Sequence, residues 1–143
     1  AQMIHMKLIV ENKYGLREFI DHVHGNYEAR CGYCYSCRLE ETARYAAENG
    51  FDTITTSLLI SPYQKHELIK LTGEKMAEKY GIGFLYRDFR PFFKEGQDRA
   101  RELGLYRQKY CGCVFSEEDR YLDRKKDLVT FQKFRNNPAP NVR

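Results

Sequence analysis

The sequence predicts an α/β fold in three layers, with a mostly parallel sheet flanked by helices. Short segments rich in apolar and β-branched residues alternate with helical segments, and this alternation is typical of parallel sheets. A chain of 143 residues is long enough to bury a core without disulfide staples. We therefore expect one α/β domain over residues 1–135, followed by a disordered tail at 136–143.

The first part of the chain predicts two strands and two helices. Residues 6–10 are apolar apart from one lysine and predict a short strand. Apolar residues recur at helical spacing over 16–23, so a helix is expected there. Good helix formers fill 39–49, and this helix is expected to begin as early as Gly32. Thr, Ile and Leu dominate 51–60 and predict a buried strand.

The second part predicts one more strand and three more helices. Ser61 precedes a proline, the favoured order for a helix cap and first turn, so a helix is expected from there to Tyr80. Residues 82–86 predict the third strand, and 97–103 predict a helix that a glycine ends. Ser116 precedes three acidic residues and is expected to cap a last helix.

Composition narrows the class of protein. The formal net charge is +4, which permits an anionic partner without requiring one. No stretch is long and apolar enough for a bilayer, and the N-terminus does not resemble a secretory signal. The cysteines are few and odd in number, which disfavours a disulfide scaffold. We therefore expect a cytoplasmic protein with reduced thiols and no membrane partner.

The cysteines fall into two groups, Cys31, Cys34 and Cys37, and then Cys111 and Cys113. The first spacing is used for iron–sulfur ligation in bacterial ferredoxins and also suits a structural zinc site. A bridge between residues two apart is strained and labile, so the second group indicates a redox-active disulfide. Alternatively, both of its thiols complete a metal site with the first group, or lie idle around a turn glycine.

Polar residues follow two of the predicted strands, where parallel α/β folds bind ligands. Tyr63, Lys65 and His66 lie at the expected start of a helix, and could hold a phosphate or a polar base. Asp88 could act as a proton donor or metal ligand, and Arg90 could bind an anion. The alternatives are ordinary helix capping for the first group and a surface ion pair for the second.

Four motifs together resemble the QueH-type epoxyqueuosine reductases. They span residues 30–43, 55–66, 88–91 and 110–113, in the order and at the distances expected of that family. The resemblance implies reduction of the epoxide of epoxyqueuosine to queuosine in tRNA. It also implies a 4Fe–4S cluster, leaves open an additional iron or zinc ion, and requires an electron donor.

The resemblance also assigns roles to the two cysteine groups. Cys31 and Cys34 match the cluster-binding motif, and Cys111 and Cys113 match a redox-active disulfide, with Asp88 as an acid for the leaving oxygen. The family has N-terminal strands and a vicinal cysteine pair that this sequence lacks. We therefore expect Cys37, a missing N-terminal segment or a second chain to supply the remaining cluster ligands.

Two other classes of function fit the same residues. A zinc-bound RNA-binding module would use the cysteines structurally and have no catalytic activity. A thiol–disulfide oxidoreductase acting on proteins would use the second cysteine pair without any metal. Metal content distinguishes the three readings.

Overall fold

The structure is a computed structural model that describes residues 6–122. The chain divides into two compact units, unit 1 (Ala1–Phe93) and unit 2 (Lys94–Arg143), and each is described by itself. The tail expected at 136–143 lies outside the described residues. The single domain expected over 1–135 also extends beyond the described residues, and it stays a prediction.

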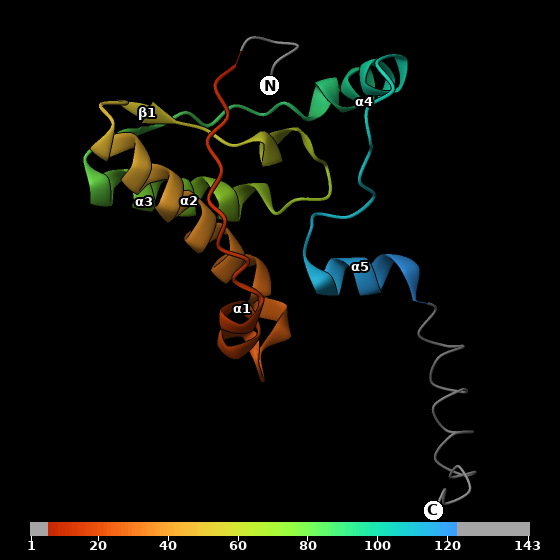
Figure 1. Ribbon diagram of the computed structural model, residues 1–143, viewed down its shortest axis with the longest axis horizontal. Coiled ribbons are helices and arrows are strands. Elements are labelled where there is room, and N and C mark those ends of the chain that lie inside the picture. Colours follow the sequence, from red (N-terminus) through yellow and green to blue (C-terminus); the bar gives the residue numbers. More distant parts are fainter. Residues whose placement is uncertain (1–5, 123–143) are drawn as a thin grey trace, which may run out of the picture. The chain divides into compact units, whose positions relative to one another are not determined.

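Helices dominate both units, and unit 1 adds a small sheet (Figure 1). No helix within residues 6–122 has both the length and the apolarity needed to cross a membrane. Unit 2 contains most of α4 (Phe93–Glu102) and all of α5 (Val114–Tyr121). In unit 1 the elements follow the chain as α1 (Leu16–Val23), the 3₁₀ turn η2 (Tyr27–Ala29), α2 (Arg30–Glu48), β1 (Thr53–Ile54), η3 (Ser57–Ile60), α3 (His66–Tyr80), β2 (Gly83–Phe84) and η4 (Arg90–Phe92).

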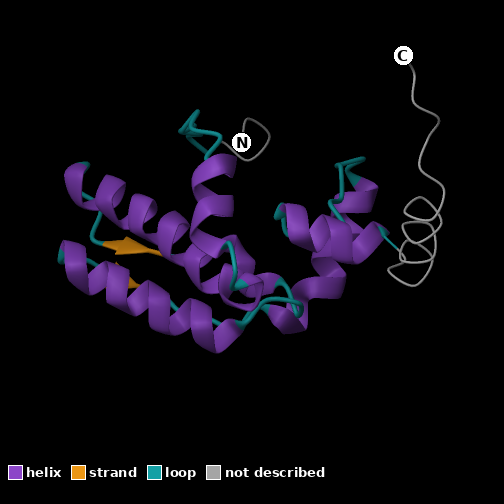
Figure 2. Ribbon diagram, turned by 90° about the horizontal axis from the view of Figure 1, so that it is seen from below, coloured by secondary structure: helices purple, strands orange, loops and turns teal. Residues whose placement is uncertain are grey.

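The sheet has two parallel strands, with Thr53 paired to Gly83 and Ile54 to Phe84. Helix α3 connects them, which makes a β–α–β crossover. Helices α2 and α3 pack against each other and lie on the same face of the sheet (Figures 1 and 2). The predicted α/β class is confirmed. The described residues supply the strand layer and one of the two expected helical layers.

The core of unit 1 forms where α2 and α3 meet the sheet. Helix α2 presents buried residues at intervals of three or four, which places them on one stripe of the helix. Leu59 from η3 and Ile69 from α3 are fully buried against this stripe. Among the described residues, every buried apolar side chain belongs to unit 1. Those on the α2 stripe are Tyr35, Leu39, Ala43 and Ala46.

One glycine lets α3 approach the sheet closely. A Cβ atom placed on Gly73 would lie 2.5 Å from the ring of Phe84 in β2. Such a distance is far inside van der Waals contact, so only glycine fits without rearrangement. Gly73 costs helix propensity in the middle of α3, but its missing side chain makes room for the aromatic ring.

The strand predicted over 6–10 is wrong. These residues are in no helix or strand, and their apolar side chains are mostly exposed. A strand requires a hydrogen-bonded neighbour, and the described sheet contains only β1 and β2. The apolar composition of 6–10 therefore indicated a preference for strand, but composition does not show whether a neighbouring strand is available for pairing.

Local hydrogen bonds shorten the strand expected over 51–60. Thr56 accepts a hydrogen bond from the backbone N–H of Leu58 (3.3 Å), which caps η3 directly after β1. Ser61 does not cap α3, which begins at His66. Its hydroxyl instead accepts from the backbone N–H of Tyr63 (3.3 Å), the bond of a local turn.

The other predicted helices are confirmed, and all except α1 begin at a different residue than expected. Helix α2 begins at Arg30, close to the early start expected at Gly32, and α1 has the predicted bounds. Helix α4 begins at Phe93 rather than at residue 97. The helix expected from Ser116 begins at Val114, with Cys113 as its N-cap residue, so that serine lies inside the first turn.

Candidate active site

The loops that follow the two strands meet at the carboxyl edge of the sheet. The backbone N–H of Phe89, after β2, donates to the carbonyl oxygen of Leu59 in η3 (3.2 Å). This contact brings the segment of residues 55–66 beside residues 88–91. Candidate residues of both segments were expected at strand ends, and the structure brings those segments together.

Helix α2 reaches the same edge through Tyr35. The Tyr35 hydroxyl donates to the Gln64 side-chain oxygen (2.7 Å) and accepts from the backbone N–H of Lys65 (3.3 Å). A Cβ atom placed on Gly32 would lie 4.0 Å from the Leu68 side chain, so the first turns of α2 and α3 are neighbours. The N-terminal cysteines of α2 are therefore on the side of unit 1 that carries the loop before α3.

The first three cysteines lie on successive turns of α2. Cys31 and Cys34 are half-buried, and Cys31 packs against the core, whereas Cys37 is exposed. A regular helix separates Cys31 from Cys37 by about 9 Å along its axis. Sulfurs that share one metal ion lie within about 4 Å of each other. For one metal ion, the helix therefore suits Cys31 and Cys34 as neighbouring ligands better than it suits all three.

The described residues do not assemble a complete metal site. No group of three or more His, Cys, Asp or Glu side chains capable of holding a metal ion occurs within 6–122. No disulfide joins any of the five cysteines within the described residues. Cys31 and Cys34 fit a cluster or metal ion as two of its ligands. Metal binding by these residues and by Cys37 stays a prediction.

A cavity of about 710 Å³ lies beside α2, and Cys37 and Tyr35 contribute to its wall. The N-terminal segment also lines it, as does the hydroxyl-rich segment directly after β1, through Thr55, Thr56 and Ser57. A hydrogen bond with Cys37, together with burial, raises the pKa of Tyr33 to about 12. Tyr33 also stacks on His22, with ring centroids 4.3 Å apart. Cys37 thus belongs to a thiol–phenol pair in this wall.

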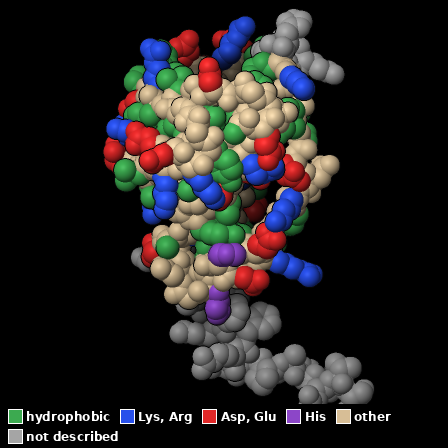
Figure 3. Space-filling model, turned by 90° about the vertical axis from the view of Figure 1, so that its left-hand side faces the viewer, with side chains coloured by type: hydrophobic (Ala, Val, Ile, Leu, Met, Phe, Trp, Pro, Cys, Tyr) green, Lys and Arg blue, Asp and Glu red, His purple; other side chains and the backbone are tan. Residues whose placement is uncertain are grey.

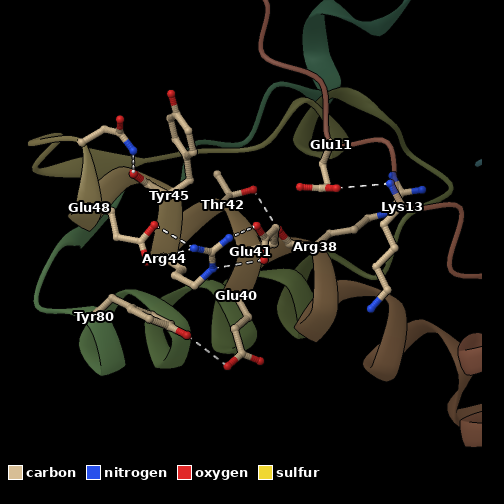
Figure 4. Close-up of polar contacts among 11 residues, drawn as sticks. Glu11, Lys13, Arg38, Glu40, Glu41, Thr42, Arg44, Tyr45, Glu48 and Tyr80 are labelled. Carbon is tan, nitrogen blue, oxygen red and sulfur yellow. Dashed lines mark hydrogen bonds and ion pairs between the residues drawn. The ribbon is translucent and has the colours of Figure 1, made fainter.

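Four of the six charged side chains that line this cavity form ion pairs, and Figure 4 draws those of Arg44. Lys13 forms an ion pair with Glu18 (2.8 Å), and Arg44 bonds to Glu41 and Glu48. Acidic and basic side chains are also interspersed on the face drawn in Figure 3. The wall residues at 11–18 carry no motif, so no pattern in the sequence predicts their place in this wall.

His66, predicted to bind substrate, is buried at the start of α3. Its exposed fraction is 6%, and its Nε2 lies 3.0 Å from the carbonyl oxygen of Ser61. A carbonyl oxygen only accepts, so Nε2 donates this hydrogen bond. Nδ1 is buried and has no hydrogen-bond partner among the described residues. His66 therefore fixes the turn before α3 through Ser61, and its second ring nitrogen has no partner there.

Two other predicted substrate-binding residues face solvent. Tyr63 is 83% exposed, and its ring contacts Phe93 edge to face at 6.0 Å between centroids. Lys65 is exposed as well, although its backbone N–H is held by Tyr35. An exposed ring beside an exposed ammonium group is available to a base and a phosphate.

Asp88 and Arg90 form a bidentate ion pair. The Arg90 guanidinium donates to both carboxylate oxygens, with an Nε–Oδ1 distance of 2.9 Å and an Nη2–Oδ2 distance of 2.6 Å. The Arg90 backbone N–H also donates to Oδ1 (3.0 Å). These bonds lower the pKa of Asp88 to about 2. At neutral pH Asp88 is therefore a carboxylate that orients Arg90, a state that does not suit the proton-donor role expected for it.

Unit 2 carries the second cysteine pair on a turn before α5. Gly112 adopts φ +87°, a left-handed conformation that favours glycine between the two cysteines. The Cys111 sulfur lies 3.0 Å from the Ser116 hydroxyl oxygen. That hydroxyl donates to the Cys113 carbonyl oxygen (2.9 Å). The predicted meeting of the two cysteine groups stays a prediction, because they belong to separate units.

Comparison with known proteins supplies the family. The family described as epoxyqueuosine reductase QueH matches residues 1–119. A relative of that name from Dehalococcoides mccartyi is 40% identical over 115 residues, covering 80% of this chain and 63% of the relative. Another from Thermotoga maritima is 42% identical over 98 residues, covering 67% of this chain and 51% of the relative.

A third relative of the same name, from Helicobacter pylori, is 34% identical over 128 residues, covering 81% of this chain and 34% of the relative. The chain thus spans less than two thirds of the length of these relatives. The matched region contains all four motifs and both cysteine groups. The chain belongs to the epoxyqueuosine reductase QueH family.

Proposed function

We propose that this chain takes part in the two-electron reduction of the epoxide of epoxyqueuosine to the alkene of queuosine in tRNA. One observation carries the proposal beyond family membership. The helix that bears Cys31 and Cys34 is hydrogen-bonded, through Tyr35, to the loop that leads to His66. In this proposal the candidate thiol ligands and the candidate substrate residues share one edge of unit 1.

The second cysteine pair can supply the electrons and protons that the reduction of the epoxide consumes. Removing the epoxide oxygen as water consumes two electrons and two protons and leaves the alkene. Cys111 and Cys113 release two electrons and two protons when they form a disulfide. One dithiol therefore matches one turnover, and an electron donor must then reduce the disulfide again.

Cys31 and Cys34 would supply two thiolates to a 4Fe–4S cluster, which relays single electrons when it is bound. An additional iron or zinc ion is compatible with this proposal. Because the described residues offer no complete ligand set, further ligands would come from Cys37 or from another polypeptide segment. Cys31 and Cys34 are half-buried on a helix that packs against the core, and this packing fixes the direction of both thiols.

The residues at the sheet edge would bind the RNA substrate. The ring of Tyr63 would stack on a base, and Lys65 would contact a phosphate. Asp88 holds the Arg90 guanidinium in one orientation, which suits recognition of a phosphate or of the departing oxygen. In this arrangement the dithiol, rather than Asp88, supplies the protons.

Anaerobic purification followed by iron, sulfide and zinc analysis tests the proposal. We expect a brown protein with iron and sulfide. Either Cys31→Ser or Cys34→Ser should lower the iron content severalfold. Cys111→Ser should keep the iron but abolish conversion of epoxyqueuosine in tRNA, measured by mass spectrometry of the nucleosides. Measuring both iron content and conversion in each variant separates loss of the cluster from loss of the dithiol.

Other results would redirect the assignment. A colourless protein with one zinc ion and RNA binding but no turnover would indicate a zinc-bound RNA-binding module. Reduction of protein disulfides by a metal-free protein would indicate a thiol–disulfide oxidoreductase. Unchanged iron in both the Cys31→Ser and the Cys34→Ser variants would remove these residues from the ligand set.

A further inference from the structure

The Ser116 side chain contacts both cysteines of the Cys111–Cys113 turn. Its hydroxyl lies 3.0 Å from the Cys111 sulfur and 2.9 Å from the Cys113 carbonyl oxygen. It sits in the first turn of α5, which begins directly after Cys113.

The proton inventory of these groups fixes the direction of the bonds. Ser116 has one hydroxyl proton, and the Cys113 carbonyl can only accept it. The bond between Cys111 and Ser116 therefore uses the thiol proton, with Cys111 as the donor and the serine oxygen as the acceptor. This pattern requires Cys111 to be a protonated thiol, as it is in the dithiol form.

We propose that Ser116 is a positioning residue that stabilises the dithiol form of Cys111 and Cys113 relative to their disulfide. The inference rests on the proposed function only in taking this pair as the redox-active one. In the disulfide, Cys111 has no proton to donate, so one of the two bonds to Ser116 is lost. The bond from Ser116 to the Cys113 carbonyl is available in both forms.

The expected effect follows from this difference. With glutathione disulfide as the oxidant, the two thiols lose two electrons and two protons, one disulfide forms, and two glutathione molecules are released. Ser116→Ala removes a bond that only the dithiol makes, so oxidation becomes more favourable. A weak, exposed hydrogen bond predicts an increase of about threefold in the oxidation equilibrium constant, or a reduction potential lower by about 14 mV.

The sequence offers a direct way to measure this couple. Trypsin cuts after Lys109 and Arg120 and releases peptide 110–120, which contains Cys111 and Cys113 and no other cysteine. Peptide 31–38 carries the other three thiols and serves as an internal control. The full chain is equilibrated in glutathione buffers, and differential alkylation with mass spectrometry gives the oxidised fraction of each peptide.

Three variants make the test specific. Ser116→Ala should shift the midpoint for peptide 110–120 and leave that of 31–38 unchanged. Ser116→Thr keeps a hydroxyl and should restore the wild-type midpoint, a rescue that loss of structure would not give. Glu118→Gln changes the same helix without touching the cysteines and should have no effect.

The outcomes separate this inference from the proposed function. A wild-type midpoint in Ser116→Ala, or a shift toward easier reduction, would overturn the role of Ser116 while the redox pair stands. Failure of peptide 110–120 to form a disulfide in the wild-type chain would overturn both the redox pair and the role of Ser116.

Discussion

The two cysteine regions differ in what holds them. Cys31 and Cys34 project from a 19-residue helix whose buried stripe packs against α3 and the sheet. Cys111 and Cys113 lie on a turn before an eight-residue helix that has no buried residue. The first setting fixes side-chain directions, and the second leaves the backbone between two thiols free of core packing.

This difference matches the chemistry proposed for each pair. A metal centre requires ligands held in one geometry, which a helix anchored in a core provides. A dithiol must change geometry when its sulfurs bond, and a turn outside the core accommodates that change at little packing cost. The contrast can be tested by perturbing each region separately.

The largest difference is expected in the free energy of unfolding when the same substitution, leucine to alanine, is made in each unit. Leu59 is fully buried and Leu105 is half exposed. Leu59→Ala should lower the free energy of unfolding by about 2–5 kcal/mol, because it leaves a cavity in the core. Leu105→Ala should change it by no more than about 0.5 kcal/mol. Urea denaturation followed by circular dichroism measures both, and similar losses would show that unit 2 has a comparable core.

A smaller effect concerns how tightly unit 1 is packed. Gly73→Ala puts a Cβ atom against Phe84 and should destabilise the protein by about 1–3 kcal/mol, despite the better helix propensity of alanine. Gly32→Ala is the matched control, because its Cβ would meet only Leu68 at 4.0 Å. That variant should be neutral or stabilising by up to about 1 kcal/mol in thermal melts. Equal stability of the two variants would contradict the close approach of α3 and β2.

The smallest effect is electrostatic. The pKa of Asp88 is about 2 because the Arg90 side chain bonds to it in the folded state. Since folding lowers this pKa, the stabilisation from the pair is present above the pKa of the unfolded chain and is lost as the pH falls toward 2. Arg90→Gln should return the Asp88 pKa toward 3.8, as followed by carboxyl-carbon NMR. Arg101→Gln should leave the titration unchanged, and a low midpoint that survives Arg90→Gln would exclude the pair as its cause.

Helical spacing of apolar residues predicted α1, and a run of good helix formers predicted α2, because both signals depend on neighbouring residues alone. Helix α1 has the predicted bounds, and α3 ends at Tyr80 as expected. The false strand at 6–10 shows the limit of composition, since pairing depends on a neighbour that local sequence does not reveal. The starts of α3 and α5 were missed because the serines expected to cap them make other bonds.

The candidate site was predictable only in part. The motifs located the residues at the strand ends, because the carboxyl edge of a parallel sheet follows from topology. They could not show that Asp88 is committed to Arg90, or that Cys37 lines a cavity beside Tyr33. Both facts depend on side-chain directions that emerge only when the elements pack.

The Tyr35 hydroxyl has a consequence for how binding events communicate. One phenol ties the cysteine-bearing helix to Gln64 and Lys65, the two residues directly before His66. A twist of the first turns of α2 upon ligation would pull on that tether and reorient the loop. Metal occupancy and RNA affinity would then be thermodynamically linked, with Tyr35→Phe as the variant that uncouples them.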